Sequence, residues 1–358
     1  MSGLPHWGRN LWLNSHAGFL VFAVLLIIAV AWTYARFVNR PGGRSKKPGV
    51  SRASSSVVPA EKAVSPKTAF GEFQPRTEAE RELEKMLQGK DEHIDLALAN
   101  WLIAAAIPQF HDLTREHYFA QLDGMIAQMR QEMAGMEKVA ASRGNNPSDA
   151  NTRCAIFCNA MVKLGFSYAE DFRQENVTPA LLKSLYSDAN NLFLAGLLRT
   201  RRGSCVSMPL LYLVIGQRLD LPVHLVAIGK HYFIRWEEPG YRMNIETTIV
   251  EKVSVTPDDS VYLEAECLTR EQLKGTDLRN LARREVVANL LFVRSAHWAT
   301  KGVEHKTQQR LDLARAHHLA PDDFGIRTSY EAVSNAHGIK PEPTSIELKP
   351  TVKKGNSI

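Results

Sequence analysis

Residues 201–236 read RRGSCVSMPLLYLVIGQRLDLPVHLVAIGKHYFIRW, and this stretch decides the fold. One thiol, Cys205, directly precedes a segment from Met208 to Leu219 that is apolar on nearly all sides, as expected for a helix buried inside a domain. A thiol at a helix N-terminus meets unpaired backbone N–H groups and a field that favours the thiolate. The same N–H groups can bind a developing oxyanion. Because Pro209 has no N–H, regular helical bonding is expected to begin only a residue or two before it.

Three strands are predicted after this helix. The segments LPVHLVAI, KHYFIRW and YRMNIETT have the alternation and composition of strands, and EEPG joins the last two. With a symmetric four-residue loop, His231 faces Glu246 directly across the hairpin, and a slip of two residues brings Asn244 into that place. A carboxylate beside an imidazole orients the ring and favours its protonated form. The sequence therefore predicts a nucleophile, Cys205, a general base and acid, His231, and an orienting carboxylate, Glu246, with Asn244 as the substitute.

The hairpin also has a purely structural interpretation. One of its two faces is expected to be core, and the other, with His231, Asn244 and Glu246, carries polar residues. A polar hairpin face is typical of a solvated surface, and a cross-strand His–Glu pair alone is typical of such a surface. Cys205 at the head of the preceding helix favours the catalytic interpretation. His224, in the middle of an apolar strand, is interpreted as a core histidine.

The N-terminal region predicts a membrane anchor. Residues 17–35, AGFLVFAVLLIIAVAWTYA, contain no charge over about the length that crosses a bilayer. The alternative is a signal peptide cleaved after Ala29-Val30-Ala31. Residues 36–67 carry seven net positive charges, which predicts a cytoplasmic location for the rest of the chain. The remainder is near −1, so no nucleic-acid partner is expected.

Helical patterning covers both flanks of the central stretch. It is predicted from Thr77 to near Pro108, over REHYFAQLDGMIAQMRQEMAGM, and over CAIFCNAMVKLGF. Cys154 and Cys158 lie four apart on one face of the last segment and are interpreted as core packing, with a redox pair as the alternative. The four cysteines do not form a disulfide framework and include no CxxC pair, so neither a metal nor a cofactor is expected.

The central stretch resembles the transglutaminase-like superfamily of papain-like folds, and is similar to its Sir-B-type bacterial branch. The similarity rests on the Arg-Gly-x-Cys-x-Ser element, on the LYL helix that ends in RLDLP, on the strand around His231, and on NIETT in place of the superfamily's Asp-Pro-Thr. Asp220 stands where that branch has glycine, and Tyr232 follows the histidine. The resemblance implies that Arg202, Gly203 and Ser207 shape the oxyanion region. A capping hydroxyl and an ordinary ion pair are the alternatives for Ser207 and Arg202.

The resemblance completes the predicted architecture, an α+β fold in which a central buried helix packs on an antiparallel sheet. Helices precede this core, and a tetratricopeptide-like helical hairpin follows it. The predicted parts are a tail (1–16), a transmembrane helix (17–35), a disordered basic linker (36–76), the transglutaminase-like domain with its N-terminal helices (77–276), the hairpin (277–323) and a C-terminal tail (324–358).

The function implied by the resemblance is cysteine-dependent acyl transfer or hydrolysis on a peptide or protein amide. Attack of the thiol on the carbonyl gives a thioester, which water or an amine then releases. The alternatives are an inactive scaffold that binds proteins and a regulator tethered at the membrane. The expected partners are accordingly the membrane and a peptide or protein substrate.

Overall fold

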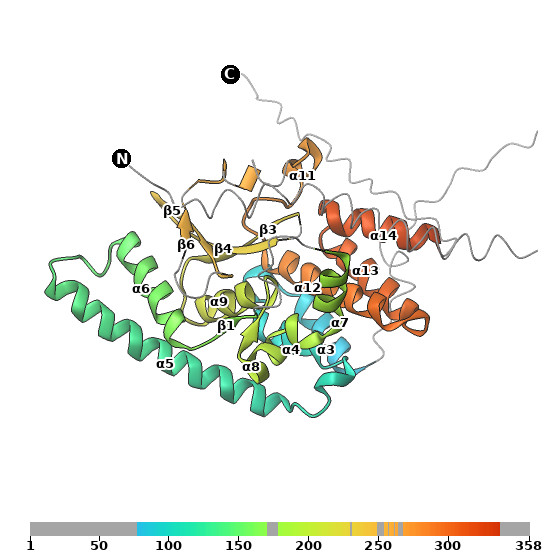
Figure 1. Cartoon of the computed structure of the whole chain (residues 1–358), viewed down its shortest axis with the longest axis horizontal. Helices are drawn as coiled ribbons and strands as arrows, with labels where there is room; N and C mark the ends of the chain where they lie inside the picture. The colour runs from blue at the N-terminus through green and yellow to red at the C-terminus, as the bar shows by residue number, and fades with distance from the viewer. Residues whose placement is uncertain are drawn as a thin grey trace, which may run out of the picture.

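The structure is a computed structural model of the chain (Figure 1). It describes residues 77–169, 178–229, 231–248, 254–256, 258–260, 262–263 and 268–336. Helices surround a four-stranded antiparallel sheet, which confirms the predicted mixture of helix and sheet. The candidate anchor, 17–35, lies outside the described residues. Among the helices that are described, none has the length and apolar character needed to cross a membrane.

The main sheet has the strand order β3-β4-β5-β6. The strands are β3 (Val223–Ile228), β4 (His231–Glu238), β5 (Tyr241–Glu246) and β6 (Ser254–Thr256). Tight turns join the first three strands, and Gly229 and Gly240 in these turns adopt left-handed φ angles of 55° and 80°. Glycine adopts such angles without a Cβ clash, so the two turns hold β4 between its neighbours.

One buried helix, α9 (Ser207–Arg218), supports this sheet. Its residues from Ser207 to Gly216 are all buried, and it lies between the sheet and the helices α4 and α8 (Figure 1). Gly216 permits the close approach of helix and sheet, because a Cβ there would lie 2.8 Å from that of Val223. The predicted central helix is confirmed, and it begins two residues before Pro209.

Shorter helices from the N-terminal half complete the layer beneath α9. Patterning predicted from Thr77 to Pro108 forms two α-helices, because Gly89 ends the first segment and the Asp95 side chain caps the second by accepting from Ala97 N at 2.9 Å. The α-helices of this layer are α3 (Glu78–Leu87), α4 (Leu96–Ala104), α7 (Pro179–Ser187) and α8 (Leu194–Thr200). Short 3₁₀ turns are η1 (Asp91–His93), η2 (Pro108–Phe110), η4 (Ala189–Asn191) and η5 (Val303–His305).

Two helices form a hairpin that extends to one end of the molecule (Figure 1). They are α5 (Arg115–Ser142) and α6 (Ala150–Lys163), and both match the predicted segments. With 28 residues, α5 is roughly 42 Å long. Cys154 and Cys158 of α6 are each 2% exposed, which confirms that both thiols are buried in the core.

The C-terminal part is helical throughout its described length. It contains α11 (Arg270–Lys274), α12 (Arg283–Lys301), α13 (Lys306–Leu319) and α14 (Phe324–Ala336). The predicted helical hairpin is α12 with α13, joined through Gly302, whose φ is 118°. The prediction of a C-terminal tail from residue 324 is wrong for residues 324–336, because these residues form α14, which packs against α13 and buries Ile326 and Val333.

The sheet is covered on both faces. The face opposite α9 carries a second apolar cluster, formed by Val226, Ile228, Phe233, Tyr262 and Leu278. The interpretation of this face as a solvated surface is therefore wrong. Its polar residues are also enclosed, since Arg235 and Asn244 are 1% and 0% exposed and hydrogen-bond each other at 2.7 Å.

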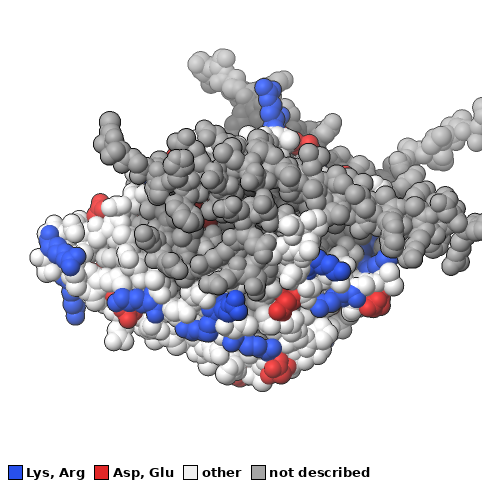
Figure 2. Space-filling model, in the orientation of Figure 1, with Lys and Arg blue, Asp and Glu red and all other residues white. Residues whose placement is uncertain are grey.

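The surface carries charges of both signs. Figure 2 shows Lys and Arg side chains in separate groups, with Asp and Glu between them, over the described part of this face. This distribution agrees with the near-neutral charge of the sequence beyond residue 67.

Candidate active site

A short turn presents Cys205 in front of α9. The preceding helix α8 ends at Arg201, which adopts a left-handed φ of 58° and lies over the Phe166 ring, with 4.1 Å between the guanidinium carbon and the ring centroid. Arg202 and Gly203 then form β2, paired in parallel with β1 (Ser167–Tyr168). The contact of Arg201 with Phe166 and the pairing of β2 with β1 thus fix the chain immediately before Cys205.

Gly203 is needed where the turn passes under α9. A Cβ at this position would lie 2.5 Å from Met208 Cγ and 2.9 Å from Leu197 Cδ1. Real Cβ atoms do not approach other atoms so closely, so a larger residue would displace the turn that carries Cys205. The role found for Gly203 is this close packing.

A buried serine pair closes the turn. Ser204 N donates to Ser207 Oγ at 3.1 Å, and Ser204 Oγ accepts from Val206 N at 3.1 Å and from Ser207 N at 3.5 Å. The Ser204 hydroxyl in turn donates to Asn191 O at 2.6 Å. The Ser204 hydroxyl therefore engages two of the N–H groups at the start of α9, whereas Ser207 Oγ accepts from a backbone N–H before the helix.

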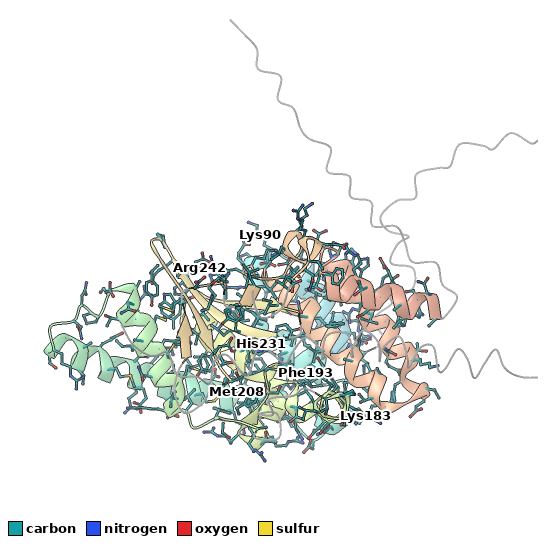
Figure 3. All side chains as sticks on the ribbon, turned by 45° about the horizontal axis from the view of Figure 1, so that its top comes forward. Lys90, Lys183, Phe193, Met208, His231 and Arg242 are labelled. Carbon is teal, nitrogen blue, oxygen red and sulfur yellow. The ribbon has the colours of Figure 1, made fainter. Side chains whose placement is uncertain are left out.

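His231 and Glu246 meet on the face of the sheet opposite α9. His231 Nε2 lies 2.9 Å from Glu246 Oε2 and 3.2 Å from Oε1, and the two side chains are 21% and 13% exposed. His231 is the first residue of β4, directly after the tight turn at Gly229. Figure 3 shows it near the centre of the molecule, away from Arg242 and Lys183 at the periphery.

The predicted hairpin register is wrong by two residues. Ile234 pairs with Ile245 and Arg235 with Asn244, because a two-residue turn replaces the expected four-residue loop. Glu246 is consequently diagonal to His231 instead of directly opposite. A shift of two keeps every side chain on its predicted face, and a long glutamate reaches across the diagonal. The contact between His231 and Glu246 was thus predicted from a wrong pairing.

The Cys205 thiol completes the group, because it lies beside the His231 ring and helps to raise the pKa of that ring. Since Nε2 faces Glu246, the nitrogen left for the sulfur is Nδ1. Cys205 is only partly buried. The structure therefore brings sulfur, imidazole and carboxylate into one chain of contacts.

Tyr262 is a fourth member that the sequence did not reveal. Its hydroxyl donates to Glu246 Oε1 at 2.8 Å, and its ring stacks on Phe233 with 4.2 Å between centroids and 10° between planes. Phe233 in turn stacks on His231, with centroids 6.4 Å apart. No motif marks Tyr262 in the sequence.

The electrostatics of the group favour an ionised His–Glu pair. Burial lowers the pKa of His231, but the Glu246 charge and the hydrogen bonds to Cys205 and Glu246 outweigh it, so that pKa lies well above its usual value. Burial likewise raises the pKa of Glu246, but the His231 charge and the bonds from His231 and Tyr262 bring it below the ordinary range. Near neutral pH the site therefore contains an imidazolium beside a carboxylate.

Two predicted residues lie outside this group. Asn244 accepts from Arg235 and donates to Asp259 Oδ1 at 2.8 Å, so it belongs to the buried Arg235 network. Arg202 is exposed, and its backbone N–H and carbonyl oxygen both hydrogen-bond Thr200 Oγ1, at 3.2 and 3.0 Å. Within the described part of the chain neither side chain contacts Cys205 or His231.

The comparison with protein families agrees with this geometry. Residues 116–291 match the sequence model of the transglutaminase-like superfamily, and this segment contains Cys205, His231, Glu246 and Tyr262. This part of the chain therefore belongs to the transglutaminase-like superfamily. No curated protein and no solved structure matches the chain. Asp220 has a left-handed φ of 53°, a backbone conformation that glycine adopts without steric cost.

Removal of the Tyr262 hydroxyl is expected to give a pH-dependent loss of stability. Because the bond helps to depress the Glu246 pKa, its contribution is present above pH ~4.3, the ordinary glutamate value, and is lost as the pH falls through the depressed folded value. Tyr262→Phe should therefore lose about 1.5–3 kcal/mol at pH 7 and clearly less at pH 3. Urea unfolding at both pH values measures this difference.

Tyr118→Phe is the matched control for this experiment. The Tyr118 hydroxyl donates to a neutral acceptor, Ala97 O, at 3.1 Å, so its loss of about 1 kcal/mol should be the same at both pH values. A Tyr262→Phe loss that does not change between pH 7 and pH 3 would show that this hydroxyl does not act on the ionised carboxylate.

Proposed function

We propose that this protein is a thiol enzyme that transfers or hydrolyses the acyl group of a peptide or protein amide. The observation that carries the proposal is the contact chain from the Cys205 thiol through the His231 ring to Glu246. A nucleophile beside a base that a third group orients is the arrangement that covalent acyl chemistry requires.

In the proposed reaction, the His231 imidazolium already carries the proton of the Cys205 thiol on Nδ1, and the sulfur attacks the amide carbonyl carbon as the thiolate. The oxyanion binds the backbone N–H of Cys205, for which no acceptor occurs among the described residues. The N–H groups of Val206 and Ser207 are less suitable, because both already donate to Ser204 Oγ. His231 then donates the proton to the leaving nitrogen as the C–N bond breaks, which leaves a thioester.

The second half of the proposed reaction returns the enzyme to its starting state. His231, neutral after the first half, takes a proton from water or an amine, which attacks the thioester carbonyl, and the C–S bond breaks to release the sulfur as a thiolate beside the imidazolium. Glu246 stays ionised, holds the ring orientation and stabilises the imidazolium in both halves. Hydrolysis and amine transfer differ only in the acceptor.

We also propose that residues 17–35 anchor this activity at a membrane, with the basic segment 36–76 beside anionic lipid and the folded part in the cytoplasm. This proposal rests on the sequence alone. The Sir-B-type branch and the tetratricopeptide-like character of α12 and α13 are likewise proposals, supported by the sequence similarity and by the helical hairpin.

A binding scaffold is the second candidate function. The observation that favours it is the packed pair α13 and α14, which lies beyond the segment matched to the superfamily. Added helical layers of this kind commonly provide binding surfaces. Under this alternative Cys205 has no chemical role.

Acyl-enzyme formation distinguishes the two functions. The full chain is mixed with a panel of peptide amides and activated peptide esters, quenched in acid and examined by intact-protein and peptide mass spectrometry. An acyl adduct on Cys205 that hydroxylamine removes, and that is absent from Cys205→Ala, is the expected result. Adducts that form no faster on Cys205 than on Cys154 in the unfolded chain would favour the scaffold.

A further inference from the structure

A second group of sulfur atoms lies on the opposite side of the sheet from Glu246. Cys154 and Cys158 are four residues apart on α6 and therefore share one helix face. The two thiols lie close enough to affect each other's pKa, and Tyr241 lies beside Cys154. Burial explains each of them as a core residue, but it does not explain why two thiols lie side by side.

These thiols line a cavity together with a thioether. The cavity has a volume of about 230 Å³, and its wall includes Cys154, Cys158 and Met243, with Tyr241 and Asn151 at its polar side. Tyr241 also donates to Asn151 Oδ1 at 3.1 Å, which holds the phenol beside the thiols. Three sulfur side chains from α6 and β5 thus face one space.

We propose that Cys154, Cys158 and Met243 bind one Cu(I) ion. Thiolate and thioether are soft ligands, and they select Cu(I) over hard ions such as Mg²⁺ and Ca²⁺. Structural zinc takes four nitrogen, sulfur or carboxylate ligands, and no group of three or more His, Cys, Asp or Glu side chains converges on a metal position within the described residues.

The charge balance of binding is simple. Two thiol protons leave, one Cu(I) enters, and no oxidation state changes, so the occupied site carries one net negative charge. Glu238, whose charge acts on Cys154, adds negative potential that favours a cation. Arg153 pairs with Glu238 at 3.0 Å and is the nearest described counter-charge to it.

This site is independent of the proposed enzyme function. Met243 and Glu246 alternate to opposite faces of β5, so Met243 faces the α9 side and Glu246 the other. Either proposal can therefore fail without the other.

The test uses the full chain with Cys205 and Cys267 replaced by serine, so that Cys154 and Cys158 are its only thiols. The reduced protein is titrated with Cu(I) without oxygen, in competition with the chromogenic chelator bicinchoninate. We expect one Cu(I) per chain to be withheld, with only sulfur neighbours in its X-ray absorption spectrum. No ion withheld by the folded protein, or a coordination shell of nitrogen and oxygen, overturns the proposal.

Variants assign the ligands. Cys154→Ser and Cys158→Ser should each abolish retention, and Met243→Leu should weaken it. Retention that is unchanged in the Cys154→Ser/Cys158→Ser double variant overturns the assignment. If serine at either position prevents folding, the absorption spectrum of the background protein still decides the outcome.

Discussion

Alkylation of Cys205 by iodoacetamide at pH 6.5 is expected to slow about 10²-fold when His231 is replaced by alanine. A thiol without a charged partner ionises near pH ~8.5, so only about 1% of it is thiolate at pH 6.5. Under the proposed function, the Cys205 sulfur reacts as a thiolate paired with the His231 imidazolium, which Glu246 holds. Removal of the ring in His231→Ala removes this charged partner and is expected to lower the fraction of reactive thiolate.

The rate is measured by quantifying the modified Cys205 peptide over time. His224→Ala is the matched control, because His224 lies on the neighbouring strand β3 and burial lowers its pKa. The sequence predicted a fully buried core histidine at this position, but His224 is only half-buried. The rate in His224→Ala should equal that of the unmodified protein. Equal alkylation rates of Cys205 in His231→Ala and His224→Ala would contradict the assignment of His231 as the catalytic base.

The same pair gives the protein a defined pH range of stability. The His231 pKa is raised, so its contribution is complete below about 6.5 and is lost as the pH rises through the higher folded value. The Glu246 pKa is lowered, so its contribution is present above about 4.3 and is lost as the pH falls through the folded value. His231→Ala should therefore remove most stability between these limits.

Replacement of Asp312 by alanine is expected to destabilise the protein by about 3–5 kcal/mol. Asp312 accepts from Arg294 Nε and Nη2 at 2.7 and 2.6 Å and from Trp298 Nε1 at 3.1 Å, and the Arg294 and Asp312 side chains are only 4% and 5% exposed. Arg294 Nη1 also donates to Ile103 O at 2.7 Å near the end of α4. The variant leaves this guanidinium buried without its counter-charge.

Urea unfolding at pH 7 measures the loss, and two controls identify its cause. Arg81→Ala breaks an exposed pair, Arg81–Glu78, and should cost at most about 1 kcal/mol. The double variant Arg294→Met/Asp312→Leu removes both charges and should recover much of the Asp312→Ala loss. A loss below about 1 kcal/mol for Asp312→Ala alone would contradict the assignment of a buried charge pair.

The sequence predicted the main elements of the site because they are local. A run of apolar residues from Met208 and the alternation around His231 and Glu246 each mark one element, and these elements have the predicted order and faces. The register was not predictable in the same way. It depends on whether two or four residues form the turn at Gly240, and both loop lengths leave the side-chain alternation unchanged.

Tyr262 shows a second limit of sequence reasoning. Its hydroxyl reaches Glu246 across 16 positions, and its ring is placed by stacking on Phe233 of strand β4. Nothing in its immediate neighbours marks it as polar support for a carboxylate. The Ser204–Ser207 pair, in contrast, had a local signal, since a serine three residues from a polar partner is typical of a helix start.

The diagonal placement of Glu246 gives a reason for the choice of acid at this position. The strand register and the side-chain length compensate each other. The hairpin places residue 246 diagonal to His231 instead of directly opposite, and the extra methylene of glutamate, compared with aspartate, lets its carboxylate reach the imidazole. An aspartate grafted onto this backbone would stop short of the ring. Acid length and turn length therefore have to change together in any redesign of this fold.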